Sequence, residues 1–146
     1  MLKQAERIEF LLNLPLFQDL DSPEFLRRLA VAMEEVTFAA EEPILAQGAR
    51  GDLLYLIVSG SVQIHIGTTV LEQLNPSDFF GELPLFSPDP PQIAIRAQTP
   101  THCLTLSQLQ LYGAIDVAPT IALGIIRVLC QRIHRLNQVI ASLAGA

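Results

Sequence analysis

The sequence predicts an α+β fold, in which a β-structure in the middle of the chain lies between helices at its two ends. Apolar residues recur at helical spacing near both termini, whereas the middle holds short runs rich in Val, Ile and Thr, separated by turn residues about every 8–12 positions. Half of the 146 residues are hydrophobic, which is enough for one sizeable core. We expect a single domain over 1–146, with N-terminal helices over 1–35, strands over 36–106 and C-terminal helices over 107–143.

Two helices are expected before the strands. Residues 2–13 place Ile8, Leu11 and Leu12 at helical spacing. A second helix is expected to begin near Ser22, which can cap it, with Pro23 in its first turn. The apolar face of this second helix comprises Phe25, Leu26, Leu29 and Met33.

The expected strands are short and regularly spaced, which is typical of a β-sandwich or barrel. Along 62–66, apolar and polar residues alternate as in a half-buried strand. The sequence Gly67-Thr68-Thr69 that follows predicts a tight hairpin turn. The strands are expected at Val36–Phe38, Pro43–Ala46, Leu53–Val58, Val62–Ile66, Val70–Leu74, Ile93–Ala97 and Cys103–Leu106.

The last helix carries an apolar seam. Ser107 can cap one helix from Gln108 onward, and Pro119 is expected to open the next. The seam residues, alternately three and four positions apart, are Ile126, Leu129, Ile133, Leu136, Ile140 and Leu143. This spacing predicts a parallel homodimer through residues 120–143, although such a seam can also pack on its own domain. A second apolar flank on the same helix, formed by Ala122, Ile125 and Val128, can pack on the domain and leave the seam free for a partner. No polar residue occurs in the seam, so the seam does not specify the number of subunits.

Composition and spacing argue against several classes of protein. The formal charge is −6 and Arg27-Arg28 is the only adjacent pair of cations, so we expect no nucleic acid binding. Cys103 and Cys130 are expected to be small buried hydrophobes, and the three histidines, including His65 and His102, show no metal or catalytic spacing. We therefore expect no metal and no enzyme activity. The apolar runs are too short for a bilayer span and there is no signal peptide, which favours a cytoplasmic protein without membrane contact.

Several stretches together resemble the cyclic nucleotide-binding domain family, which includes the sensor domains of catabolite-activator-type regulators and the regulatory subunits of cAMP-dependent kinase. The stretches are Leu16-Phe17, 38–48, 54–60 and Asn75–Leu83, and the last of them resembles the family's Pro-Gly-Asp-Phe-Phe-Gly-Glu motif. The resemblance covers nearly the whole chain. It implies an eight-stranded β-roll, a jelly-roll-like double-stranded β-helix, flanked by N-terminal helices and a long C-terminal helix that often serves as hinge and dimer seam.

The resemblance also implies a ligand site for cAMP or cGMP, with no further cofactor. A cyclic phosphate needs one fixed cation and several backbone N–H donors, and in the family a glutamate accepts from the ribose 2′-hydroxyl. Glu82 matches that glutamate, although its carboxylate can equally cap backbone N–H groups at the corner. The candidate ligand-binding residues are Phe80, Gly81, Glu82, Leu83, Gln92 and Ile93.

The phosphate-binding segment departs from the family pattern. Counted back without gaps from Leu106-Ser107, Arg96 falls on a strand residue that is not a ligand, and the phosphate arginine falls on Pro91, with Gln92 beside it. Pro84 has no N–H to donate, and no Lys or Arg occurs between Arg50 and Arg96. These departures argue against cAMP and cGMP as ligands. An insertion in the loop 87–91 would instead bring Arg96 into the site as the phosphate contact.

Two functions follow from the sequence. The first is a regulatory sensor module for signal transduction, in which a small molecule near Gly81-Glu82 shifts the last helix. The alternative is a ligand-free, degenerate domain used for dimerisation or for docking a protein partner. The chain shows no helix-turn-helix, kinase or channel segment, so we expect either a stand-alone module or a fragment of a longer protein.

Overall fold

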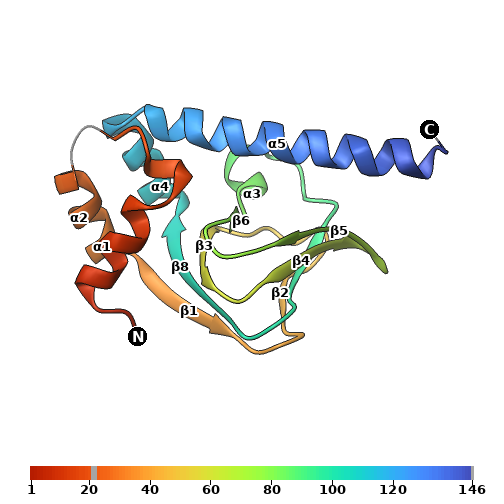
Figure 1. The fold of residues 1–146 in the computed structure, drawn as a ribbon, viewed down its shortest axis with the longest axis horizontal. Helices are drawn as coiled ribbons and strands as arrows, with labels where there is room; N and C mark the ends of the chain where they lie inside the picture. The colour runs from red at the N-terminus through yellow and green to blue at the C-terminus, as the bar shows by residue number, and fades with distance from the viewer. Residues whose placement is uncertain (21–22, 146) are drawn as a thin grey trace.

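Two four-stranded antiparallel sheets form a β-roll, and the helices gather on one side of it (Figure 1). The computed structural model describes residues 1–20 and 23–145. The strands are β1 (Glu34–Phe38), β2 (Pro43–Leu45), β3 (Leu53–Ser59), β4 (Val62–Ile66), β5 (Thr69–Leu74), β6 (Phe79–Phe80), β7 (Ala94–Ala97) and β8 (Thr101–Ser107). The helices are α1 (Gln4–Leu12), the 3₁₀ turn η1 (Pro15–Phe17), α2 (Pro23–Ala32), α3 (Leu83–Phe86), α4 (Gln108–Val117) and α5 (Thr120–Leu143).

The strand order confirms the predicted α+β class and the β-roll. One sheet has the order β1-β8-β3-β6 and the other β2-β7-β4-β5. The predicted hairpin between β4 and β5 is present, with Ile66 paired to Thr69. The strand pattern did not predict β6, because two residues are too few to show an alternation.

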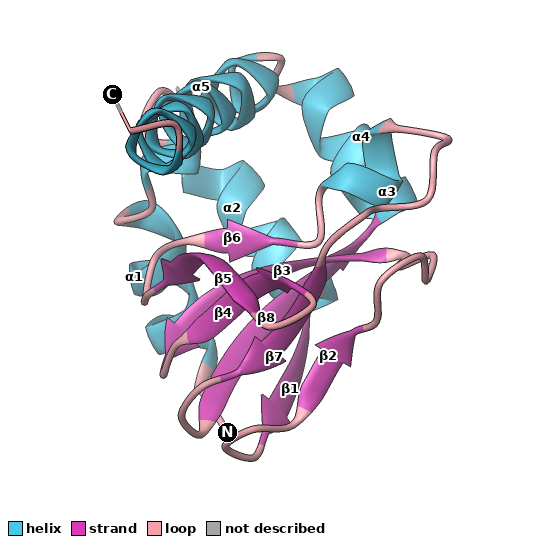
Figure 2. Ribbon diagram, turned by 90° about the vertical axis from the view of Figure 1, so that its right-hand side faces the viewer, coloured by secondary structure: helices cyan, strands magenta, loops and turns pink. Residues whose placement is uncertain are grey.

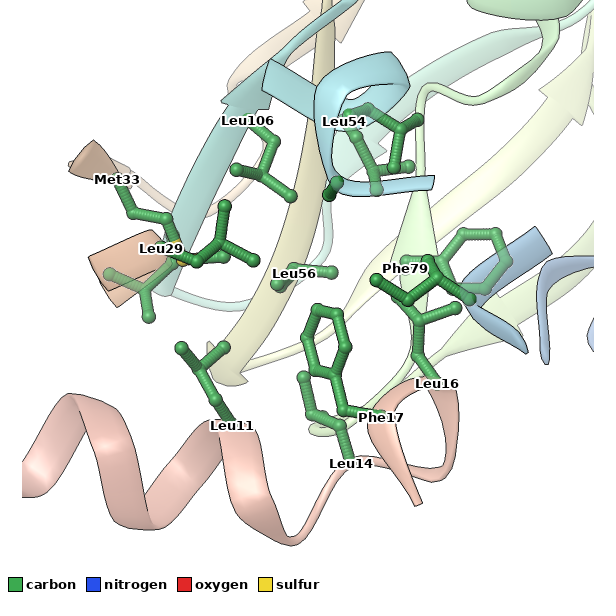
Figure 3. Packing of buried hydrophobic residues seen from close by; sticks show 14 of the residues in the cluster. Leu11, Leu14, Leu16, Phe17, Leu29, Met33, Leu54, Leu56, Phe79 and Leu106 are labelled. Atoms are coloured by element: carbon green, nitrogen blue, oxygen red, sulfur yellow. The ribbon is translucent and has the colours of Figure 1, made fainter. Parts of the chain in front are cut away.

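The chain has two hydrophobic cores because β3 and β8 are covered on both faces. Leu54 and Leu56 of β3 face the helices, whereas Ile57 turns into the roll between the sheets. Figure 3 shows the helix-side core, in which Leu11 of α1 and Phe17 of η1 pack against these strands. Burial on both faces explains why these two strands read as nearly continuous apolar runs.

The two N-terminal helices are joined to each other by polar contacts as well as by the core. Arg7 of α1 donates from Nη1 to the carbonyl oxygens of Ala30 and Met33, at 2.9 and 2.7 Å. Ala30 lies in the last turn of α2 and Met33 directly follows the helix, so neither carbonyl has a partner within α2. The bonds from Arg7 satisfy both. Leu12, expected on the apolar face of α1, is exposed, because the core lies on the side of Leu11. The predicted cap Ser22 lies outside the described residues.

Helix α5 crosses over the roll as a long rod (Figures 1 and 2). The start of α5 packs closely on η1, since Gly124 has no side chain. A Cβ at this position would lie 3.0 Å from the carbonyl oxygen of Leu16. Farther along, Arg135 forms an ion pair with Glu72 of β5. No single helix in the described part of the chain is long and apolar enough to cross a membrane, and the pair α4 and α5, which passes that test jointly, is bent by 116°.

Local signals placed the C-terminal helices correctly. The Ser107 hydroxyl accepts from the Gln110 N–H, and the Gln110 side chain accepts in return from the Ser107 N–H, which forms a capping box. Pro119 precedes α5 directly, as predicted. The expectation that Cys130 is buried was wrong: it is exposed, because it lies on the outer side of α5. His102 is half-buried and pairs with Glu35. Cys103 is buried as expected, and burial raises the pKa of its thiol to about 12.

Candidate functional site

A sharp corner at Gly81 sets the position of Glu82. Gly81 has a φ of 88°, and a Cβ there would lie 2.5 Å from the carbonyl oxygen of Leu53, so only glycine fits without strain. The preceding residue, Phe80, is fully buried and stacks on Tyr55 at a centroid distance of 4.7 Å. The corner therefore rests on the core of the roll and directs Glu82 to the start of α3.

Glu82 is paired with an arginine from the C-terminal helix. Nη1 of Arg132 donates to Oε1 of Glu82 at 2.6 Å, and Nη2 donates to the carbonyl oxygen of Phe79. The guanidinium also lies 4.6 Å above the centre of the Phe79 ring. Both Glu82 and Arg132 are buried, with exposed fractions of 7% and 6%. The glutamate that matches the ribose-binding position thus serves here as an anchor for α5.

The electrostatics of this pair are only partly balanced. Burial raises the pKa of Glu82 above its ordinary value, although the Arg132 guanidinium and the N–H groups of Glu82 and Leu83 oppose that shift. Nε of Arg132 is buried without a hydrogen-bond partner. A buried pair that leaves one donor unsatisfied is costly to maintain, because neither charge is fully compensated for the loss of water.

The cradle beside Glu82, where the family's phosphate would lie, is small and apolar. We use the name cradle for the cavity of about 10 Å³ that has Glu82 at its edge. Its other walls are Leu45, Gly81, Leu83, Pro84, Pro91, Ile93 and Ile95. A volume of this order holds about one water molecule. No Lys or Arg lines the cradle, and Pro84, in the first turn of α3, has no N–H to offer an anion.

Arg96 makes its contacts away from the cradle. Its Nη2 donates to the side-chain oxygen of Gln63 at 3.0 Å, and its Nη1 lies 3.6 Å from the carboxylate of Glu41. Ile95 and Ala97, the strand neighbours of Arg96, are buried on the opposite face of β7. Gln92, the other candidate polar contact, is exposed in the loop before β7. The structure thus brings Gly81, Glu82, Leu83 and Ile93 together at the cradle. It leaves Gln92 and Arg96 outside the cradle, and it buries Phe80 in the core of the roll beneath the corner.

Arg132 is the site residue that the sequence analysis missed. Its position on α5 nevertheless carries a signal. Ile121, Ile125, Val128 and Arg132 are spaced by four, three and four residues, and the first three pack against the helix-side core. An arginine that continues an inward-facing stripe is predicted to be buried and therefore paired with a carboxylate.

The predicted seam on α5 is exposed over most of its length. The exposed fraction is 54% for Ile126, 56% for Ile133, 63% for Ile140 and 79% for Leu143. Leu129 and Leu136 are half-buried, and Leu129 packs partly against the helix-side core. The flank formed by Ile125 and Val128 does pack on the body of the chain, as the sequence analysis required for a free seam.

Comparisons with known proteins agree on one family. Residues 35–116, more than half of the chain, match the model of the cyclic nucleotide-binding domain. A CRP-like cAMP-activated global transcriptional regulator of Mycobacterium tuberculosis is 31% identical over 140 residues, which cover 92% of this chain and 62% of the regulator. A cAMP-dependent protein kinase regulatory subunit of Dictyostelium discoideum is 34% identical over 119 residues, which cover 74% of this chain and 36% of that subunit.

Solved structures show the same fold. The catabolite activator protein of Thermus thermophilus superposes with a TM-score of 0.74 at 27% identity, covering 89% of this chain and 63% of that protein. The N-terminal domain of a transcriptional regulator from Streptomyces coelicolor superposes with a TM-score of 0.66 at 31% identity, covering 90% of this chain and 94% of that domain. The chain covers less than two thirds of the length of each of the two curated relatives named above: 62% of the regulator and 36% of the kinase regulatory subunit.

Proposed function

Because this chain belongs to the cyclic nucleotide-binding domain family, we propose that it is a non-enzymatic regulatory module in which the Gly81-Glu82 corner controls the position of α5. The ion pair between Glu82 and Arg132 carries this proposal. It joins the corner that precedes α3 directly to the long helix. A ligand or partner that competes for the Glu82 carboxylate must displace Arg132 and so loosen α5.

We further propose that this module binds cAMP and cGMP weakly or not at all. The cradle holds about one water molecule, no cation lines it, and α3 has a proline in its first turn. Arg50 lines the larger neighbouring cavity of about 420 Å³, which shares Pro84 and Pro91 with the cradle, and its guanidinium donates to the carbonyl oxygen of Pro88. A hydrogen bond to a charged group contributes about 1.5–3 kcal/mol, so the loss of the phosphate cation alone lowers affinity by one to two orders of magnitude, roughly. The relatives named as cAMP-activated or cAMP-dependent motivate the test below.

Calorimetric titration with cAMP and cGMP tests this part of the proposal. We expect no heat of binding for the wild type and no change in Arg96→Ala. The double variant Pro84→Ala/Pro91→Arg restores an N–H and a cation, and it is expected to bind cAMP at least about tenfold more tightly than the wild type. Pro84→Ala/Pro90→Arg is the matched control, because Pro90 is exposed and lies outside the cradle lining. Tight wild-type binding that Arg96→Ala abolishes would overturn the proposal.

The seam on α5 supports the proposal that two copies associate as a parallel homodimer. Its exposed isoleucines form one stripe on a helix that is already held to the body by its opposite face. Sedimentation of the wild type is expected to give twice the monomer mass, and Ile133→Asp/Ile140→Asp is expected to give the monomer. Gln131→Asp/Gln138→Asp places the same charges on exposed positions outside the seam and should remain dimeric. A wild type that stays monomeric on concentration would contradict this proposal.

The alternative, a ligand-free module for dimerisation or protein docking, is favoured by one observation. Apolar side chains fill the cradle and the family's glutamate is already occupied within the chain. The expectations that this chain binds no nucleic acid and that it works in the cytoplasm stay predictions from its sequence. The relatives named as transcriptional regulators bear on whole proteins, of which this chain matches a part.

A further inference from the structure

An apolar groove lies between α3 and α5 and shares Glu82 and Leu83 with the cradle. The groove has a volume of about 270 Å³. Its apolar walls are Leu83, Phe86, Ala122, Ile125, Ile126 and Leu129. Glu82 and Ser87 supply the rest of the wall, and the exposed surface of the groove is almost entirely apolar. We call it the α3–α5 groove, and we propose that it binds a small, uncharged, mainly apolar molecule of one or two rings.

The size of the groove favours a small molecule over a helix from another protein. An α-helix with its side chains is about 10–12 Å across and rises about 5.4 Å per turn, so a single turn takes up roughly 400 Å³ or more and exceeds the volume of the groove. By contrast, an apolar cavity of about 150 Å³ lined by Leu, Ile and Phe binds benzene. A groove of 270 Å³ therefore suits one or two fused rings.

The charges around the groove favour an uncharged ligand. No Lys or Arg lines the groove, and its one ionisable wall residue, Glu82, is already paired with Arg132. An anionic ligand would meet no cation there, and a cationic ligand would have to displace Arg132 from Glu82. Burying an unpaired charge costs more than the apolar contacts of a small ligand provide, so the site selects neutral molecules.

The walls are exposed apolar side chains that gain most from being covered. The exposed fraction is 43% for Leu83, 46% for Phe86 and 54% for Ile126. Leu83 and Glu82 line both the groove and the cradle, so a molecule in the groove touches the helix that follows the Gly81-Glu82 corner. This inference deepens the proposed function. It rests on the proposed function only in the claim that binding in the groove changes the position of α5. Occupancy of the groove does not depend on that role.

The test uses the full chain with labelled Ile, Leu and Ala methyl groups, titrated with indole and followed by NMR. We expect saturable shifts of the methyl groups of Leu83, Ile125 and Leu129. Ala122→Phe fills the groove and is expected to raise the half-saturation concentration at least about tenfold. Ala141→Phe, on an exposed position of the same helix, is the matched control and should leave it unchanged. Indole-3-acetate, which carries a negative charge, should bind at least about tenfold more weakly than indole.

Three results would overturn this proposal. The first is the absence of saturable shifts up to the solubility limit of indole. The second is equal binding to Ala122→Phe, or to Leu83→Ser, which trims the wall from the α3 side. The third is an equal weakening of indole binding by the control Ala141→Phe, because the effect of Ala122→Phe would then not be local to the groove. Tight binding of cAMP would contradict the proposed weak nucleotide binding but leave the indole result untouched, so the two failures are distinguishable.

Discussion

Among the described residues, a partly buried pair of carboxylate and guanidinium near the N-terminus and a buried pair near the C-terminus hold helices to the β-roll. At the N-terminal end, Nη2 of Arg7 in α1 lies 3.0 Å from Oε1 of Glu35 in β1. At the C-terminal end, Nη1 of Arg132 in α5 lies 2.6 Å from Oε1 of Glu82. The two carboxylate side chains have the same exposed fraction of 9%, but Glu82 lies in the buried interior of the chain whereas Glu35 lies in a partly buried site.

The two carboxylates differ in how well their charge is compensated. Burial pushes the pKa of Glu35 up, but hydrogen bonds from Arg7, from His102 and from the Leu2 N–H outweigh burial and hold the pKa below its ordinary value. Nε2 of His102 lies 2.7 Å from the second oxygen of Glu35. For Glu82 burial prevails and the pKa is raised. The N-terminal attachment is therefore saturated with donors, whereas the C-terminal attachment is not.

This difference indicates which helix is easier to release. Each guanidinium donates to its carboxylate and to backbone carbonyl oxygen, but Nε of Arg132 is in addition buried without an acceptor. The attraction between Glu82 and Arg132 is thus offset in large part by the cost of removing both charges from water. The net free energy by which the pair holds α5 to the corner is therefore small. An attachment of this kind suits a helix whose position is to be changed by a ligand, and the N-terminal attachment suits a fixed support.

Removing Arg132 is expected to have the largest effect. Arg132→Met keeps the apolar stem but leaves Glu82 buried without its cation, which should lower the free energy of unfolding by about 3–5 kcal/mol. Urea denaturation at pH 7 measures the change. Arg127→Met is the matched control on the same helix, because the pair of Arg127 with Asp19 is exposed and should contribute no more than about 1 kcal/mol.

A double-mutant cycle sharpens this prediction. Glu82→Gln/Arg132→Met removes both charges, so it should recover a large part of the stability that Arg132→Met loses. If the double variant is as unstable as the sum of the two single variants, the two side chains act independently and the corner is not coupled to α5. That outcome would also remove the observation that carries the proposed function.

Local patterns in the sequence predicted the helices and a β-sandwich or barrel between them, and the resemblance to the family specified the β-roll. The capping box at Ser107, the proline before α5 and the alternation in β4 each placed an element correctly. The sequence did not predict either ion pair, because both join residues far apart in sequence: Arg7 with Glu35, and Glu82 with Arg132. The number of residues between two positions does not show that the fold will bring them together.

The candidate site, too, was predicted only where it depends on a local motif. The corner at Gly81 was found from a contiguous motif, and its close approach to Leu53 explains why that motif needs glycine. The apolar filling of the cradle was not predicted, because its walls come from distant segments that include Leu45 and Ile95. The identity of each wall residue is visible in the sequence, but their convergence depends on the pairing of β2 with β7.

Removing the charge of Glu35 is expected to have an intermediate effect that disappears in acid. Glu35→Gln should lower the free energy of unfolding by about 1–3 kcal/mol at pH 7, because Arg7 and His102 lose a charged acceptor. Since the pKa of Glu35 is lowered in the folded protein, its contribution is present above the unfolded pKa of about 4.3 and is lost as the pH falls through the folded pKa.

Urea denaturation of the wild type and of Glu35→Gln over a pH series measures this loss. Glu34→Gln is the control, because Glu34 is exposed on the same strand, and its effect should be small at every pH. A difference between wild type and Glu35→Gln that persists at about pH 2–3 would show that the side-chain amide disrupts packing, and that the charge of Glu35 is not what stabilises the N-terminal attachment.

Removing the charge of Glu82 is expected to have the smallest effect and the opposite dependence on pH. Glu82→Gln retains an oxygen that accepts from Arg132, so its effect should be within about 1 kcal/mol. Because the pKa of Glu82 is raised in the folded protein, folding takes up a proton and the wild type loses stability as the pH rises above about 4.3. Relative to Glu82→Gln, the wild type should therefore be less stable at pH 7 than at about pH 4.

The same pH series of urea denaturation measures this slope, with Glu41→Gln as the control. Glu41 pairs with Arg96 at the surface and has an exposed side-chain fraction of 66%, so its variant should show no slope. A wild type that gains stability over Glu82→Gln with rising pH would mean that Arg132 more than offsets the burial of Glu82. The C-terminal attachment would then be as well compensated as the N-terminal one, and α5 would be a fixed support rather than a movable helix.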